Sequence, residues 1–445
     1  MYSADGRMEK TTINKISAKI IPIMVMLYVI AYIDRQNIGF AKLHMAESLS
    51  LSETAYGLGA SLFFIGYLLF EVPGNIILHK VGARLWFARI MLTWGAITVL
   101  MAFTTSASMF YVLRFCLGAA EAGLYPGLLY YMTRWFPLSY RPRVVGYLIM
   151  ASLAANLIGA PLNGALLSIH GILNLEGWQW IFIGTGLPAL LFIIPVLFWL
   201  PDTPEKARFL SAEEKAWLGA MLQQEQSRDR DRQVNGVLKT LKDVRVLLLA
   251  LVLGFISFGA YGLSYWMPTI VKGFGVSDMT NGLINMIPWL MAMLLLWWMT
   301  RNPARTSDPV KNIALPMLVA ALFLAGSALF IATPWLSFLC ITLVIMAIFS
   351  IQPCFWTLTR FLGGSAAAAG LAAINSLANL GGFFAQNTVP AVRDLTGSVS
   401  APMYYLGGCM AIGCVVTLLT IRYLHRRSDD QDPLPHTDSP QKGAL

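Results

Sequence analysis

A run of four polar residues lies deep inside the first apolar stretch of the chain. Residues 20–44 read IIPIMVMLYVIAYIDRQNIGFAKLH, with Asp34, Arg35, Gln36 and Asn37 in succession. Residues 20–33 alone would form a helix of about 21 Å at ~1.5 Å per residue, shorter than the ~30 Å apolar core of a bilayer. A charge at that depth costs at least ~3 kcal/mol and normally faces a partner or a wet cavity. The pattern therefore predicts a buried functional pair and not a helix that ends in water.

A second pair of charges lies in a later apolar stretch, FYVLRFCLGAAEAGLYPGLLYYMT. Arg114 and Glu121 are seven residues apart, which is two helical turns, so both project from one face of the helix. Their Cα atoms would be about 10 Å apart, too far for contact except by long extended side chains. We therefore expect their partners on another helix, and Asp34 and Arg35 lie at a comparable depth. Gly118, between the two charges, is expected to leave open volume beside them.

Two arginines and two carboxyl groups at one depth suit the binding of an anion together with a proton. Arginine holds a carboxylate through a planar, bidentate fork and stays charged when it is desolvated. A substrate carboxylate that engages Arg35 and Arg114 would compete with Asp34 or Glu121 for the guanidinium groups, so that substrate and proton would bind together. The alternative is structural, in which the charges pair only to insert safely into the bilayer.

The composition excludes a soluble globular chain. Of the 445 residues, 57% are hydrophobic and 12% are charged, whereas about a quarter of the residues are charged in soluble domains. The five cysteines lie in apolar runs without metal-ligand spacing, which indicates packing residues. No Walker loop, dinucleotide-binding glycine pattern or zinc-spaced histidine pair is present. We expect no enzyme, no metal and no cofactor.

Apolar runs long enough to span a membrane occur twelve times, six on either side of one polar stretch. They are residues 20–40, 57–78, 85–103, 110–133, 144–168, 178–200, 246–271, 283–299, 313–332, 335–358, 367–389 and 403–423. This pattern predicts an all-α membrane protein with twelve transmembrane helices in two six-helix bundles. The expected divisions are an N-terminal tail 1–19, a first bundle 20–200, a connector 201–245, a second bundle 246–424 and a disordered tail 425–445.

The basic residues predict the orientation. If the N-terminus lies inside, only Lys42, Lys272 and Arg393 among the 32 lysines and arginines fall in outer loops, which is the positive-inside asymmetry. Both termini and the connector are then cytoplasmic. Because topology explains the net charge of +9, no nucleic-acid partner is expected. Within the connector, Ser211 and Glu214 are spaced as a capping box that opens a short surface helix.

Several segments together resemble the major facilitator superfamily, and more narrowly its anion:cation symporter branch. The segments are YIDRQNIGFA (32–41), YGLGASLFFIGYLLFEVPGNIILHKVGAR (56–84), RFCLGAAEAGLYPGLLYYMTRWFP (114–137) and LPDTPEKARFLSAEEK (200–215), with YGLSYWMPTIV and IQPCFWTLTRFLGGSAAAAGLAAINSLANLGGF in the second half. That branch includes bacterial permeases for tartrate, sugar acids such as rhamnonate and galactonate, and aromatic acids such as phthalate and hydroxyphenylacetate. The resemblance implies two pseudo-symmetric bundles that bind substrate between them near the membrane midplane.

The resemblance also implies roles for particular residues. Arg35 and Arg114 would hold the substrate carboxylate, and Asp34 and Glu121 would take up protons. Six further positions fall where pocket contacts of that branch lie: Tyr32, Tyr67, Ser152, Trp356, Asn375 and Asn379.

Two loops depart from the superfamily pattern. His79 stands where an Asp is usual after the second span, and Ala304 occupies the acidic place of the corresponding loop in the second half. The cytoplasmic ionic latches are therefore expected to differ. Glu71, nearer the inner end of its span, is expected to pair with basic residues such as Arg84 or Arg143.

Taken together, these patterns predict a proton-coupled symporter for a small organic anion in a bacterial inner membrane. The expected substrate is a sugar acid or hydroxycarboxylate such as rhamnonate, galactonate or tartrate, carried by alternating access in a monomer. The alternatives are an aromatic carboxylate, anion exchange by the same fold, and a membrane receptor that binds its ligand without moving it.

Overall fold

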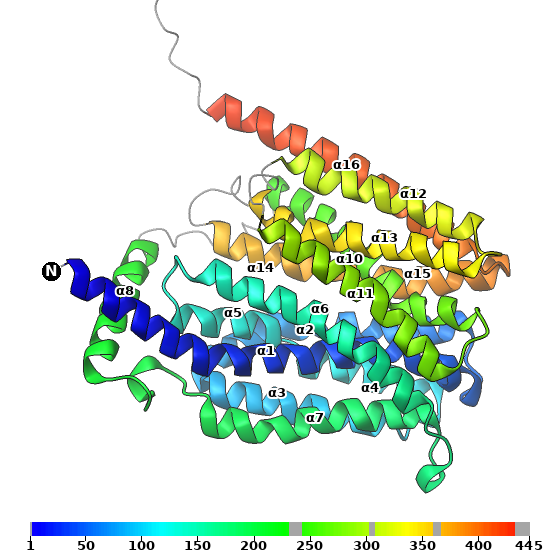
Figure 1. Cartoon of the computed structure of the whole chain (residues 1–445), viewed down its shortest axis with the longest axis horizontal. Helices are drawn as coiled ribbons and strands as arrows, with labels where there is room; N and C mark the ends of the chain where they lie inside the picture. Colours follow the sequence, from blue (N-terminus) through cyan, green and yellow to red (C-terminus); the bar gives the residue numbers. More distant parts are fainter. Residues whose placement is uncertain (1, 231–242, 302–307, 359–365, 432–445) are drawn as a thin grey trace, which may run out of the picture.

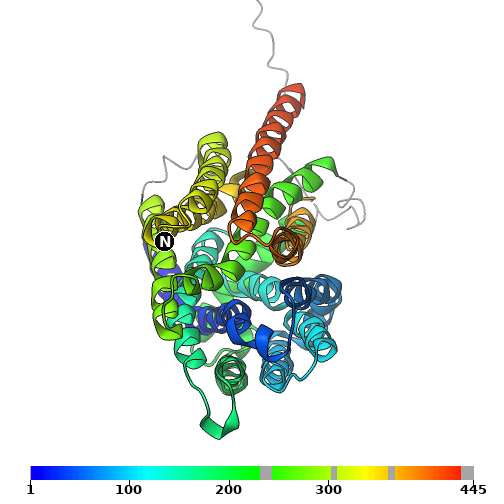
Figure 2. The same cartoon turned by 90° about the vertical axis from the view of Figure 1, so that its right-hand side faces the viewer.

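Helices make up nearly all of the chain that the computed structural model describes, which is residues 2–230, 243–301, 308–358 and 366–431 (Figure 1). The first half contains α1 (Tyr2–Ser48), α2 (Glu53–Val81), α3 (Ala83–Met101), α4 (Ala107–Glu121), α5 (Leu124–Trp135), α6 (Arg141–Leu167) and α7 (Gly177–Trp199). The second half contains α10 (Val244–Lys272), α11 (Asp278–Thr300), α12 (Leu315–Leu329), α13 (Pro334–Phe355), α14 (Ala366–Ala378), α15 (Leu380–Thr396) and α16 (Ala401–Gln431). The two halves lie side by side (Figure 2).

Eleven helical segments of the described chain are long and apolar enough to cross a membrane. The remaining predicted span, residues 367–389, is divided at Asn379 into α14 and α15, whose 13 and 17 residues are each too short to be counted alone. The predicted all-α fold with twelve membrane spans is therefore confirmed.

The N-terminal polar stretch, predicted as a tail, is helical. Residues 2–19 continue α1 as one helix, in which Thr12 and Ile16 are fully buried. Lys15 forms an ion pair of 2.7 Å with Glu214 of α8 (Ala212–Arg230), so the helical extension is held against the connector. At the other end of the chain, α16 runs to Gln431, and the rest of the predicted disordered tail, residues 432–445, lies outside the described residues.

The capping box of the connector is confirmed. The backbone N–H of Glu214 donates to Ser211 Oγ at 3.2 Å, and the backbone N–H of Ser211 donates to Glu214 Oε2 at 2.8 Å. These two reciprocal bonds satisfy N–H groups that the first turn of a helix otherwise leaves without partners.

Two glycines bring α2 and α4 into backbone contact. A Cβ atom added at Gly118 would meet the carbonyl oxygen of Phe63, and one added at Gly66 would meet that of Phe115. Small residues allow such close approach between helices in membranes. The space beside Gly118 is thus filled by the backbone of α2, and the predicted open volume at this position is wrong.

We expect Gly118→Ala to destabilise the protein. The added methyl group would lie within the contact distance of a backbone oxygen, so α2 would have to move, and overpacking of this kind costs roughly 1–3 kcal/mol. Thermal unfolding in detergent measures the effect. Gly146→Ala in α6 is the matched control, because nothing lies within 4 Å of a Cβ at that position. Equal melting temperatures for the two variants would show that the α2–α4 contact tolerates the methyl group.

The two halves contact each other at the end of the bundle opposite the N-terminus, here named the closed end and defined by the loops 49–52, 273–277 and 397–400 (Figure 1). Arg393 of α15 pairs with Glu53 of α2 at 3.2 Å, and Asp394 accepts from Thr54 at 2.6 Å. Gly164 and Gly282 bring α6 and α11 together in the same way that glycines join α2 and α4.

Candidate functional site

A cavity of about 130 Å³ lies between the two halves. Its lining includes seven of the eight residues predicted to bind substrate, drawn from both halves: Tyr32, Arg35, Tyr67, Ser152, Trp356, Asn375 and Asn379. Most of the remaining lining is aromatic or polar: Tyr28, Gln36, Tyr125, Asn156, Ser257, Tyr261, Ser264, Phe349 and Gln352. The cavity thus combines one guanidinium group with hydroxyl, amide and aromatic groups.

Among the described residues, Arg35 is the charged residue that lines this cavity. Its Nε donates to Glu121 Oε1 at 2.8 Å, its Nη2 lies 2.6 Å from the same oxygen, and its Nη1 donates to the hydroxyl of Tyr261 at 3.2 Å. The guanidinium carbon also lies 5.1 Å and 5.4 Å from the ring centroids of Tyr32 and Tyr67. An aromatic cage around a guanidinium stabilises the cation while its edge stays accessible.

Glu121 is held in place by a break in the fourth span. α4 ends at Glu121, Gly123 follows with a left-handed φ of 88°, and α5 begins at Leu124. A glycine adopts this conformation at little steric cost. Glu121 is fully buried, and its Oε2 has no hydrogen-bond partner among the described residues. One carboxylate oxygen therefore holds Arg35, and the other is available to a proton.

Asp34 points away from the cavity into the core of the first half. Its Oδ1 accepts from Asn37 at 2.7 Å and from Thr185 at 3.1 Å, and its Oδ2 accepts from Trp94 at 2.6 Å and from Thr98 at 3.2 Å. Only 1% of the residue is exposed. These four donors come from α1, α3 and α7, so Asp34 joins the helices of one half. It forms no ion pair within 4 Å with an arginine of the described chain.

Arg114 does not line the central cavity. Its Nη2 donates to the backbone carbonyl of Ala60 at 2.9 Å, its guanidinium carbon lies 5.1 Å from the ring centroid of Phe63, and only 3% of the residue is exposed. It shares a much smaller cavity with Asp34 and Arg35. The structure therefore brings the two arginines together at this smaller cavity and not at the central one, because α2 packs over Arg114. That Arg114 binds the substrate carboxylate stays a prediction.

Glu71 has a different partner from the one predicted. It is buried and accepts from Ser376 Oγ of α14 at 2.5 Å, whereas Arg84 contacts Asp202 and Arg143 contacts Tyr147. The predicted pairing with a basic residue of the first half is wrong. Glu71 instead joins α2 to the second half beside Asn375, which lines the cavity.

Tyr28 is a lining residue that the sequence reasoning missed. Its hydroxyl donates to Tyr32 at 3.2 Å, and its ring stacks on Tyr125 with centroids 5.4 Å apart. A signal was present, because Tyr28 precedes Tyr32 by four residues and Arg35 by seven and so shares their helical face. Ser257 and Phe349 were missed as well, and no spacing to a charged residue distinguishes them.

Of the two positions that depart from the superfamily loop pattern, the structure describes His79 and not Ala304. The ring of His79 packs on Tyr130 with centroids 4.0 Å apart, which is an aromatic contact in place of an acidic latch. Ala304 lies outside the described residues.

Comparisons with known proteins agree on a family of membrane transporters. A sequence profile of the Major Facilitator Superfamily matches residues 24–386. The chain is 42% identical to a quinolone resistance transporter of Acinetobacter baumannii, over 94% of this chain and 97% of that protein. It is 41% identical to a putative tartrate transporter of Agrobacterium vitis, over 93% of this chain and 92% of that protein.

A solved structure shows the same fold at low sequence identity. The xylose transporter XylE from E. coli, in an inward-open conformation, matches with a TM-score of 0.73 and 16% identity, over 91% of this chain and 95% of that chain. At this identity the match concerns the arrangement of the helices alone.

Proposed function

The chain belongs to the Major Facilitator Superfamily, and from that premise we propose that it takes up a small organic anion together with protons across a bacterial inner membrane. As a member of this family it is a multi-pass membrane transporter and not an enzyme. The family match and the relatives establish transport, whereas the substrate and the coupling to protons are our proposal.

One observation carries the proposal: a single buried ion pair, Arg35 with Glu121, stands at the wall of the cavity between the halves. Of the two partners, the Arg35 side chain is 15% exposed and that of Glu121 is fully buried. A substrate carboxylate in the cavity can therefore reach Arg35, whose planar fork suits a carboxylate. To bind it fully, the substrate has to compete with Glu121 for the guanidinium.

Protonation of Glu121 would favour binding of the substrate carboxylate to Arg35. Removing one partner of a buried ion pair leaves an uncompensated charge, which is strongly unfavourable. If Glu121 is protonated, Arg35 needs a new anion, and the substrate supplies it. Conversely, a bound substrate removes the need for an ionised Glu121. Anion and proton thus bind with positive coupling, which is the requirement for symport.

Asp34 has a separate part in the proposed cycle. All four of its contacts are donors to a carboxylate, and the indole of Trp94 cannot accept a hydrogen bond in return. Protonation of Asp34 would remove the negative charge that these donors stabilise, and would therefore weaken the contacts of α1 with its neighbours α3 and α7. We propose that Asp34 links proton uptake to the packing of the first half.

The proposed cycle is one of alternating access. With both termini and the connector in the cytoplasm, the closed end faces the outside. The ion pair between Arg393 and Glu53 then belongs to an outer gate that must open to admit the anion. The hydrogen bond from Ser376 to Glu71 would be remade as the two halves rock about the cavity.

The cavity lining favours a hydroxylated carboxylate. Besides Arg35, the lining offers amide groups from Asn156, Asn375 and Asn379 and hydroxyl groups from Ser152 and Ser257. These are suitable partners for the hydroxyl groups of tartrate or of a sugar acid such as rhamnonate or galactonate. The relative named as a putative tartrate transporter supports this substrate class.

An aromatic carboxylate is the second candidate, and one observation favours it. Five tyrosines, Phe349 and Trp356 line the same cavity, and stacked aromatic rings bind aromatic ligands well. The relative named as a quinolone resistance transporter agrees with an aromatic ligand.

A thermal-shift screen of the purified protein separates the two substrate classes. We expect hydroxycarboxylates to raise the melting temperature, since a ligand at about 100 times its Kd stabilises the folded state by about 2.7 kcal/mol. The matched panel contains tartrate and galactonate against phthalate and hydroxyphenylacetate, at acidic and neutral pH. Stabilisation by the aromatic acids alone would support the second candidate, and stabilisation by no acid would contradict an organic-anion substrate.

Liposomes that contain the protein test the coupling. A pH gradient alone should drive accumulation of the acid identified in the screen. If the acid enters only in exchange for an internal anion, the protein is an exchanger, and if it binds but never enters, the receptor alternative holds.

A further inference from the structure

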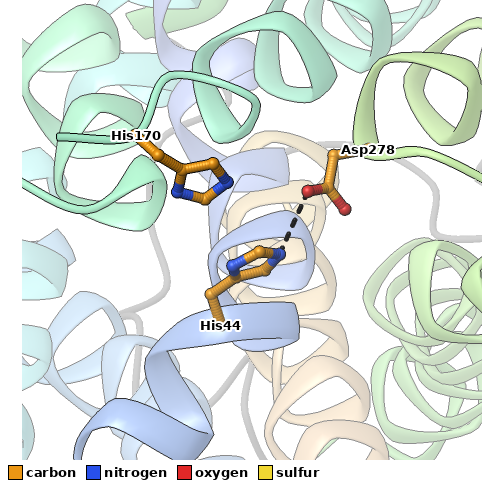
Figure 3. A group of neighbouring side chains, drawn as sticks. All are labelled: His44, His170 and Asp278. Atoms are coloured by element: carbon orange, nitrogen blue, oxygen red, sulfur yellow. Dashed lines mark ion pairs between the residues drawn. The ribbon is translucent and has the colours of Figure 1, made fainter. Parts of the chain in front are cut away.

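Three side chains with metal-ligating atoms meet at the closed end, outside the central cavity (Figure 3). His44 lies near the end of α1, His170 follows α6, and Asp278 is the first residue of α11. His44 Nε2 lies 3.1 Å from Asp278 Oδ2, and the two imidazole rings stack with centroids 5.4 Å apart. One ligand atom from each residue lies within 4.8 Å of the other two. Neither the substrate site nor the proposed coupling uses these residues.

Two imidazoles and one carboxylate form a donor set that zinc binds in proteins. Tetrahedral zinc has bonds of about 2.0–2.2 Å to nitrogen and oxygen, so its ligand atoms are about 3.3 Å apart. The contact between His44 and Asp278 is already near that separation. His170 is exposed and lies in the segment that follows α6, so a rotation of its side chain can bring it to the same distance. Water completes the fourth position.

The carboxylate of Asp278 is oriented by a second residue. Lys272 Nζ of α10 donates to Asp278 Oδ1 at 2.6 Å, which leaves Oδ2 on the side of His44. Hydrogen bonds from outside the ligand set commonly fix the orientation of ligating carboxylates in this way. The arrangement therefore places one carboxylate oxygen beside His44, within reach of a common point once the side chain of His170 rotates.

We propose that His44, His170 and Asp278 bind a divalent transition-metal ion such as zinc, and that the ion holds the closed end shut. The two histidines belong to the first half and Asp278 to the second, so the bound ion joins the halves. Opening of this end must separate them and remove a ligand. A ligand that binds one conformation better shifts the population toward it, so the ion inhibits the transport cycle. A simple ion pair between His44 and Asp278 is the competing interpretation.

Calorimetric titration of the full chain with zinc, at neutral pH in detergent, tests the site. We expect one zinc ion per chain, with affinity at least about tenfold weaker in His44→Ala and in His170→Ala. His79→Gln is the matched control, because His79 packs on Tyr130 and lies outside the cluster. Zinc binding in both alanine variants as tight as in the unchanged protein would overturn the proposal. Asp278→Asn is a further variant in case an alanine variant does not fold.

The locking effect needs a measurement other than transport. Spin labels at the exposed positions Leu173 and Leu395, one in each half, with the native cysteines replaced, report the separation of the halves at this end. We expect zinc to narrow the distance distribution to its shortest component, and to have no effect when His170→Ala is present. If zinc binds and the distribution is unchanged, the ion does not lock the closed end.

Discussion

Arg35→Lys is expected to weaken binding of the substrate anion by about 10- to 100-fold. Lysine keeps the positive charge that neutralises Glu121, but it loses the planar fork that can hold two carboxylate groups at once. Each tenfold loss corresponds to about 1.4 kcal/mol. Arg35 is also surrounded by the rings of Tyr32, Tyr67 and Phe63. These rings pack against a flat guanidinium, and the ammonium group of lysine cannot reproduce that packing. The ligand-induced shift in melting temperature, measured over a range of ligand concentrations, gives the affinity.

Arg114→Lys is the matched comparison for this prediction. Arg114 does not line the central cavity and donates to the carbonyl of Ala60, so this variant should lower the protein's own stability more than its ligand affinity. If Arg114→Lys weakened the ligand as strongly as Arg35→Lys, then Arg114 would contact the substrate in another conformation of the cycle. Unchanged affinity in Arg35→Lys would contradict the assignment of Arg35 as the anion anchor.

Glu121→Gln is expected to abolish accumulation driven by a proton gradient and to leave exchange of labelled for unlabelled substrate intact. The amide oxygen can still accept a hydrogen bond from Arg35, so the geometry of the site is retained. The glutamine side chain cannot ionise, however, and it permanently mimics the protonated glutamate. The substrate then has no carboxylate to compete with, and its binding is no longer coupled to a proton. Uptake and counterflow in liposomes measure the two activities separately.

Glu71→Gln is the control for Glu121→Gln. Glu71 is also buried, but it contacts Ser376 and no arginine within 4 Å among the described residues, so its amide should keep uptake driven by the proton gradient. Persistence of gradient-driven accumulation in Glu121→Gln would show that the coupling proton binds elsewhere, with Asp34 the next residue to test. Loss of both uptake and counterflow would indicate a structural role for Glu121.

Many of the residues that lie together at the central cavity could be predicted from the sequence. Arg35 and Glu121 pair between two spans, as expected from charges at equal depth that cannot reach a partner on their own helix. The cavity residues from the second half, Trp356, Asn375 and Asn379, line the same space as Arg35. These expectations depended on depth in the membrane and on family resemblance, and both are properties of the linear sequence.

The sequence could not distinguish the roles of residues that are adjacent in the chain. Asp34 and Arg35 were treated as one unit, yet successive residues of a helix point about 100° apart. Arg35 consequently faces the cavity while Asp34 faces α3 and α7. The open volume expected at Gly118 was wrong for a related reason, because the backbone of α2 fills the space beside it, and α2 also accepts a hydrogen bond from Arg114.

The sequence by itself determined that this chain is an all-α membrane protein with twelve spans and charges buried in the first half. These properties follow from apolar length and from the cost of charge in lipid, which are set by stretches of about 20 consecutive residues. Only the tertiary structure decided which charge meets the cavity, that Glu71 contacts Ser376, and that His44, His170 and Asp278 converge. Such contacts join residues far apart in the chain, and they depend on how each helix is rotated against its neighbours. That rotation is set by close packing, for example at Gly66 and Gly118, and no local pattern specifies it.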